Sequence, residues 1–174
     1  MTALFELLKI IIPSGAVFAA AYFLVKRFLD NDEKRREYDL KKSTLGTVTP
    51  IRIQAFERII IYLERINPNS LVVRVNKNGM SARQLQMELV HAIKTEYEHN
   101  LSQQIYLSST AWELVKNAKE EVIQLVNISS SKVSNDANSS ELAIMLLNIT
   151  ANIGKKLPND IAIDFIKKEI AQIF

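Results

Sequence analysis

Two Glu and His pairs at helical spacing are the residues of this chain that come nearest to a chemical site. They are Glu88 with His91 and Glu96 with His99, in the stretch MELVHAIKTEYEH. Glu and His three residues apart share one face of a helix, and di-iron carboxylate bundles use this spacing on each of two different helices. Here both pairs fall on one predicted helix, about 12 Å apart along its axis, so they cannot line one two-metal centre in a monomer. We therefore predict no metal, no cofactor and no catalytic residue.

The densest group of hydrogen-bonding side chains follows, in EHNLSQQIYLSSTAW, residues 98–112. Turned inward, these side chains would form a polar network that fixes the chain before Trp112; turned outward, they would offer a partner-binding surface. We favour the structural role. The residues concerned are His99, Asn100, Gln103, Gln104 and Tyr106. The alternative is a ligand-binding or metal-binding helical domain, with or without enzymatic activity, that uses residues 88–106.

Composition excludes several other kinds of site. The chain has no cysteine and only four dispersed glycines, so it has no disulfide, no thiolate site and no glycine-rich phosphate loop. The net charge of +3 is spread unevenly: residues 26–45 hold seven basic and five acidic side chains, whereas residues 46–174 hold 14 and 13. Because basic and acidic side chains nearly balance in residues 46–174, this part of the chain lacks the basic stripe that nucleic-acid binding needs.

An apolar segment lies close to the N-terminus, in KIIIPSGAVFAAAYFLVKRF, residues 9–28. Its uncharged run, Ile10 to Val25, would span about 24 Å as a helix, against a bilayer core of about 30 Å. Apolar neighbours and the long side chains of Lys9, Lys26 and Arg27, which can reach the head groups, extend it to about 23 residues. We predict an uncleaved membrane anchor over residues 1–29, with a cleaved signal or a buried core helix as alternatives.

The basic residues around this segment predict its orientation. Seven Lys and Arg lie between 26 and 42, whereas only Lys9 precedes the run. The positive-inside bias then puts the N-terminus outside and the rest of the chain in the cytoplasm, at the inner membrane. Gly15 and Ala19 form a small-xxx-small pair at which a second membrane helix could approach.

A charged segment, residues 30–49, follows the anchor and predicts an exposed helical stalk. Acidic residues precede basic ones by four positions, as in Asp32 with Arg36, which supports a helix. We expect Gly46 to end the stalk, and Thr49 with Pro50 to begin the first helix of a domain that covers residues 50–174.

Residues 50–174 read as an all-α domain of about five or six helices. An apolar stripe from Phe56 to Ile66 fits packing against another helix, and we expect it to serve self-association. SLVVRV, residues 70–75, could be strand or helix, and we choose helix because no second strand-like run exists to pair with it. Capping boxes are expected at Ser81 with Gln84 and at Thr110 with Glu113. A polar, mobile loop over 129–140 and two further helices, 141–153 and 158–174, complete the domain.

Two blocks, TVTPIRIQAFERIIIYLERINP and EHNLSQQIYLSSTAWELVKNAKEE, together with the apolar N-terminus, carry a family resemblance. The chain resembles an uncharacterised family of small bacterial, single-pass, membrane-anchored helical proteins. The resemblance implies anchorage and a helical domain, and it brings no activity, cofactor or catalytic residue.

Architecture and the lack of catalytic signatures together favour a scaffold, an adaptor or an accessory subunit of an inner-membrane assembly. The expected partners are the lipid bilayer and other membrane proteins or a second copy of the chain. A sensor of anionic lipid surfaces that works through residues 26–42 is a further alternative.

Overall fold

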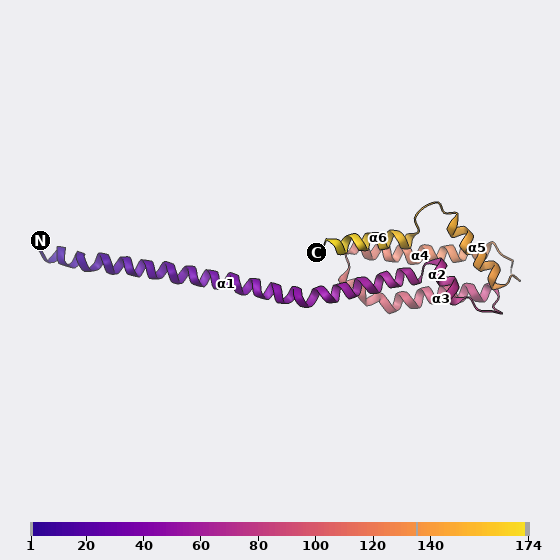
Figure 1. Cartoon of the computed structure of the whole chain (residues 1–174), viewed down its shortest axis with the longest axis horizontal. Helices are drawn as coiled ribbons and strands as arrows, with labels where there is room; N and C mark the ends of the chain where they lie inside the picture. Colours follow the sequence, from indigo (N-terminus) through magenta and orange to yellow (C-terminus); the bar gives the residue numbers. More distant parts are fainter. Residues whose placement is uncertain (1, 135, 173–174) are drawn as a thin grey trace. The chain divides into compact units, whose positions relative to one another are not determined.

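The computed structural model of the chain describes the backbone of residues 2–134 and 136–172, and side chains in 14–43, 45–134 and 136–172. Over these residues the chain forms α-helices, one 3₁₀ helix and no strand, which confirms the all-α prediction (Figure 1). The elements are α1 (Thr2–Arg65), α2 (Pro68–Val75), α3 (Ala82–Asn100), η1 (Leu101–Tyr106), α4 (Ser109–Ser131), α5 (Ser139–Ala151) and α6 (Pro158–Ala171).

Helix α1 does not end where the sequence predicted. The chain divides into two compact units, Met1–Thr49 and Pro50–Phe174, but α1 continues through Gly46 and Pro50. Proline inside a helix removes one backbone hydrogen bond at a cost of about 3 kcal/mol, and many helical residues on both sides outweigh this single break. The predicted break at 46–50 is therefore wrong, because isolated Gly and Pro residues without a loop sequence do not end a long helix.

The predicted anchor gains no support from the helices of the structure. Among the described residues, no helix is both long enough and apolar enough to cross a membrane. The first residues of the uncharged run, 10–13, lie outside the part of the chain whose side chains are described. In the following segment, Asp32 pairs with Arg36 at 2.9 Å, as the spacing predicted.

The core of the unit Pro50–Phe174 forms around α4, which packs against α3, α5 and α6 (Figure 1). Phe56, Ile59, Leu63 and Ile66 are fully buried in the same core. The stripe therefore packs inside the monomer, and the prediction that it serves self-association is wrong. Its spacing matched helix packing, but the partner helices belong to the same chain.

The helix ends of this unit follow the sequence in part. SLVVRV is helical within α2, and Ser81 with Gln84 forms the capping box that begins α3, as predicted. Helix α4 begins earlier than expected, because Ser108 and not Thr110 is its N-cap. The Ser108 hydroxyl accepts a hydrogen bond from the backbone N–H of Ala111.

The polar loop between α4 and α5 is shorter than predicted. Helix α4 continues to Ser131, and Asn138 with Glu141 forms the capping box of α5. The loop is also tied to the start of α3, because the N–H of Ala82 donates to the carbonyl of Ala137 at 2.9 Å. Residue 135 of this loop lies outside the described residues. So do residues 173–174, where the last predicted helix was to end.

Candidate functional site

The two Glu and His pairs do not converge in the fold. Glu88, His91 and His99 are all exposed on α3, whereas the Glu96 carboxylate binds two arginines. Within residues 14–43, 45–134 and 136–172, no three His, Asp or Glu side chains gather closely enough to hold a metal ion. Three of the four side chains therefore face solvent, and the fourth, Glu96, belongs to a polar network.

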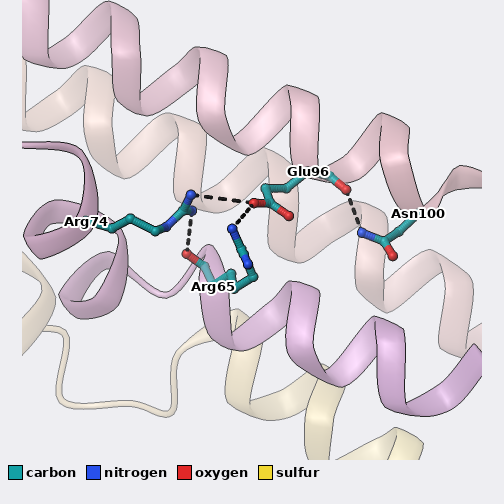
Figure 2. A network of polar contacts seen from close by, with 4 residues as sticks. All are labelled: Arg65, Arg74, Glu96 and Asn100. Atoms are coloured by element: carbon teal, nitrogen blue, oxygen red, sulfur yellow. Dashed lines mark hydrogen bonds and ion pairs between the residues drawn. The ribbon is translucent and has the colours of Figure 1, made fainter. Parts of the chain in front are cut away.

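Glu96 joins the ends of three helix segments (Figure 2). Its Oε1 lies 2.7 Å from the Arg65 guanidinium, at the end of α1, and 3.5 Å from that of Arg74 on α2. Arg74 also donates to the backbone carbonyl of Arg65 at 3.3 Å. A cation that binds the last carbonyl of a helix is favoured by the negative end of the helix dipole.

The remaining carbonyls at the end of α1 are also paired. The Asn159 side-chain amide of α6, which is fully buried, donates to the carbonyl of Leu63 at 2.7 Å. Backbone N–H groups of Ile66 and Asn67 bind the carbonyls of Tyr62 and Glu64. The last four carbonyls of a helix have no partner within it; here the two residues that follow α1 supply a partner for two of them, and α2 and α6 supply one each.

The polar segment 98–112 divides between the interior and the surface. Asn100 and Gln103 are buried, His99 and Gln104 are exposed, and Tyr106 is half-buried. Asn100 donates to the Glu96 backbone carbonyl at 2.8 Å and Gln103 to the Ser102 hydroxyl at 3.1 Å. In the part of the chain that the structure describes, no hydrogen bond joins these five side chains to one another. The segment is ordered by local bonds and not by one shared network.

Three aromatic rings follow one another beside this segment. The Trp112 ring, which is buried, stacks on that of Tyr97 at 5.6 Å, and Tyr97 lies 6.2 Å from the ring of Tyr62. The Lys119 ammonium sits 4.2 Å from the centre of the Tyr97 ring. Such pairs add about 0.5 to 1.5 kcal/mol each beyond the burial of their area, so the group ties α1, α3 and α4 together.

The Tyr62 hydroxyl is a buried polar group without a hydrogen-bond partner among the described residues. Its ring is 1% exposed. Burial, with smaller contributions from Tyr97, Glu120 and Glu96, raises the pKa of Tyr62 far above the ordinary value for tyrosine. The hydroxyl therefore stays protonated, and the group cannot act as a base at neutral pH.

The start of α4 is completed by a residue of α6. The Glu169 carboxylate accepts from the backbone N–H of Ser108 at 3.0 Å and from its hydroxyl at 2.6 Å. In a capping box this role belongs to Glu or Gln at the third helical position, which here is Ala111. Sequence reasoning missed Glu169 and Arg74, and no local pattern marks either residue, because each acts on a distant helix end.

The residues predicted to flank or contact a membrane are placed as follows. Lys26 and Arg27 are exposed on α1, and so are Gly15 and Ala19. Among the described residues, a methyl group added at Gly15 would meet nothing within 4 Å. The side chain of Lys9 lies outside the described residues.

Comparison with known proteins identifies a family and no activity. The model of a family of unknown function (DUF7935) matches residues 2–173. The chain belongs to this family. No curated protein and no solved structure matches it. The function must therefore be argued from the chain's own residues.

The first prediction concerns the Glu96 network. We expect Glu96→Gln to lower the free energy of unfolding by about 1 to 2 kcal/mol, because two partly shielded guanidinium groups lose their counter-charge. Urea unfolding followed by the fluorescence of Trp112, the single tryptophan, measures it. The matched control is Glu113→Gln, which breaks an exposed pair with Lys116 and should cost clearly less than Glu96→Gln, because solvent screens an exposed pair. Equal losses in the two variants would contradict a special role for Glu96.

The second prediction concerns the Tyr62 hydroxyl. Tyr62→Phe removes an unpaired buried polar group and should raise the free energy of unfolding by about 1 kcal/mol. Because the folded-state pKa is raised, the native state loses stability as pH rises above about 10, where an unfolded tyrosine ionises. The variant should lose less stability between pH 9 and pH 11, on the order of 1 kcal/mol. Tyr106→Phe, at a half-buried ring, is the control, and a similar gain in it would refute the argument.

Proposed function

We propose that the protein is a membrane-anchored adaptor or accessory subunit of an inner-membrane assembly. In this proposal the N-terminal part of α1 lies in the bilayer, and the unit Pro50–Phe174 binds partner proteins at the cytoplasmic face. The role is one of binding and holding, without catalysis.

The observation that carries the proposal is the row of exposed apolar side chains on α1. Large apolar residues between 17 and 29 are more than half exposed, among them Phe18 at 75% and Leu24 at 70%. Residues 22–25 are consecutive members of this row, so apolar side chains occur on all sides of the helix, which is the pattern of a helix buried on all sides. Exposure to water costs about 25 cal/mol per Å² of apolar surface, so we infer that lipid covers them.

The charged residues that follow support an interfacial position. Lys26 and Arg27 are exposed near the end of the apolar row, before Phe28 and Leu29, and long basic side chains at the end of a membrane helix reach the head groups. Five more basic residues follow by Lys42, which favours contact with anionic lipid and a cytoplasmic C-terminal unit.

The interior of the unit Pro50–Phe174 supports a binding role. Two of its partly buried carboxylates, those of Glu96 and Glu169, are engaged at helix ends. These groups stabilise the unit, so we assign partner contact to its exposed surface. Self-association through Gly15 and Ala19 stays a prediction.

The third prediction tests the anchor. The full chain should stay in the membrane fraction after an alkaline carbonate wash and leave it only with detergent. Phe18→Glu with Phe23→Glu should release it, because each charge at mid-membrane costs about 2.5 to 3.5 kcal/mol. Leu40→Glu with Leu45→Glu alters two equally exposed apolar residues of the charged segment and should leave it bound. Release of the unaltered chain by carbonate would refute the anchor.

The fourth prediction tests the orientation, for which the absence of cysteine is an advantage. A membrane-impermeant maleimide should label Thr2→Cys in intact spheroplasts, and Ser140→Cys only after the membrane is opened. Both follow from the excess of basic residues after the apolar row. Labelling of Ser140→Cys in intact spheroplasts would contradict the assignment.

A further inference from the structure

One face of α3 forms a groove with α4 on the surface of the unit Pro50–Phe174. Its volume is about 510 Å³. Residues three and four positions apart on a helix lie on the same face, and the groove follows this spacing over three turns of α3. Its lining residues are Arg83, Gln86, Met87, Val90, His91 and Lys94 of α3, with Asn127 of α4. We call it the α3 groove.

The charges of the α3 groove are all of one sign. Arg83 and Lys94 are exposed at its two ends, about 16 Å apart along the helix axis, and exposed His91 lies between them. No acidic side chain lines the groove, although the unit as a whole is nearly neutral. Among the described residues, neither Arg83 nor Lys94 has an ion-pair partner within the chain. Their charges are therefore free to meet an acidic partner.

An apolar strip runs between these charges. Met87 is 56% exposed, and Val90 is half-buried beside it. Methionine is flexible and polarisable, and it is common on surfaces that receive apolar side chains of a partner. The groove thus combines an apolar floor with basic ends.

The wall of the α3 groove is held in place by hydrogen bonds to α4. The Gln86 amide donates to Asn127 Oδ1 at 3.0 Å and accepts from the Ser130 hydroxyl at 2.8 Å. A second hollow of about 370 Å³ shares Arg83 and Gln86 and continues along the end of α4 to Val133. A rigid and extended recess reduces the ordering cost of binding.

We propose that the α3 groove binds an acidic amphipathic helix of a partner protein. Apolar residues of the partner would lie on Met87 and Val90, and its carboxylates would meet Arg83 and Lys94. An amphipathic helix in a groove is a common mode of peptide recognition, with anchors at i, i+3, i+4 and i+7. The inference rests on the proposed adaptor function, to which it adds the chemistry of the partner.

A recess favours this occupant over a lipid surface. Bilayer head groups form a nearly flat layer on this scale, so they reach protruding lysines and arginines but not a half-buried valine between them. A helix of about 10 Å diameter with its side chains can place an apolar side chain in the recess and acidic ones at both ends. The Gln86 amide and Asn127 add hydrogen-bonding groups at the wall.

The fifth prediction uses a synthetic probe and the full chain in neutral detergent micelles. The probe is a fluorescein-labelled helical peptide of about 18 residues with leucines at i, i+4, i+7 and i+11 and glutamates beside them. Fluorescence anisotropy should show saturable binding. Arg83→Glu with Lys94→Glu should weaken it by at least about tenfold, because like charges then face each other. Met87→Glu should weaken it as well, by loss of the apolar contact.

Matched controls separate the groove from net charge. Lys167→Glu with Lys168→Glu changes two exposed α6 residues and the net charge equally, and it should alter the affinity by less than about twofold. A peptide with lysines in place of the glutamates should bind the Arg83→Glu with Lys94→Glu variant better than the unaltered chain, which would support the proposal directly. The folded state of each variant is checked by Trp112 fluorescence.

Several outcomes would overturn the proposal. They are the absence of saturable binding, equal binding of a scrambled peptide of the same composition, and equal weakening in the α6 control. Displacement of the probe by phosphatidylglycerol in the micelles, lost in the Arg83→Glu with Lys94→Glu variant, would identify a lipid-headgroup surface instead. None of these depends on carbonate extraction, so failure of the groove and failure of the anchor are distinguishable.

Discussion

The closure of the C-terminal end of α1 is the constraint on which the packed unit depends. The last four carbonyls of the helix have no partner within it, and two of them, those of Tyr62 and Leu63, belong to buried residues. Backbone N–H groups of Ile66 and Asn67 satisfy two of the four, Arg74 of α2 satisfies the third and Asn159 of α6 the fourth. The buried Leu63 carbonyl therefore depends on a helix that is 96 residues away in the sequence.

This constraint determines what the polar residues of the interior do. Glu96 keeps Arg74 in position at the end of α1, and Glu169 completes the start of α4. Of the side chains that first suggested chemistry, Glu96 is thus part of the framework, whereas Glu88, His91 and His99 are exposed on α3. We therefore assign recognition to the surface of the unit.

Much of the fold was predictable because its signals are local. Apolar periodicity identified the packed stripe from Phe56 to Ile66, and Ser81 with Gln84 marks the start of α3. The start of α4 was misplaced because its second capping partner, Glu169, is 61 residues away. The break at Gly46 was wrong because single residues do not outweigh a long helix. The self-association of the Phe56 to Ile66 stripe was wrong because periodicity reports burial but not which chain provides the partner.

The α3 groove was less predictable from the sequence than the fold, because it depends on which charged side chains have no ion-pair partner. Residues 26–42 are the most basic part of the chain, and among their described basic side chains Arg36 forms an ion pair, with Asp32 at 2.9 Å. The α3 groove lies in a nearly neutral unit, and it keeps Arg83 and Lys94 without ion-pair partners among the described residues. A basic side chain without an ion-pair partner attracts an acidic group more strongly than a paired one does, because no existing partner must be displaced first. Net charge alone therefore does not decide which basic surface of this protein can select a partner, and the α3 groove is distinguished by a lining that contains basic and no acidic side chains.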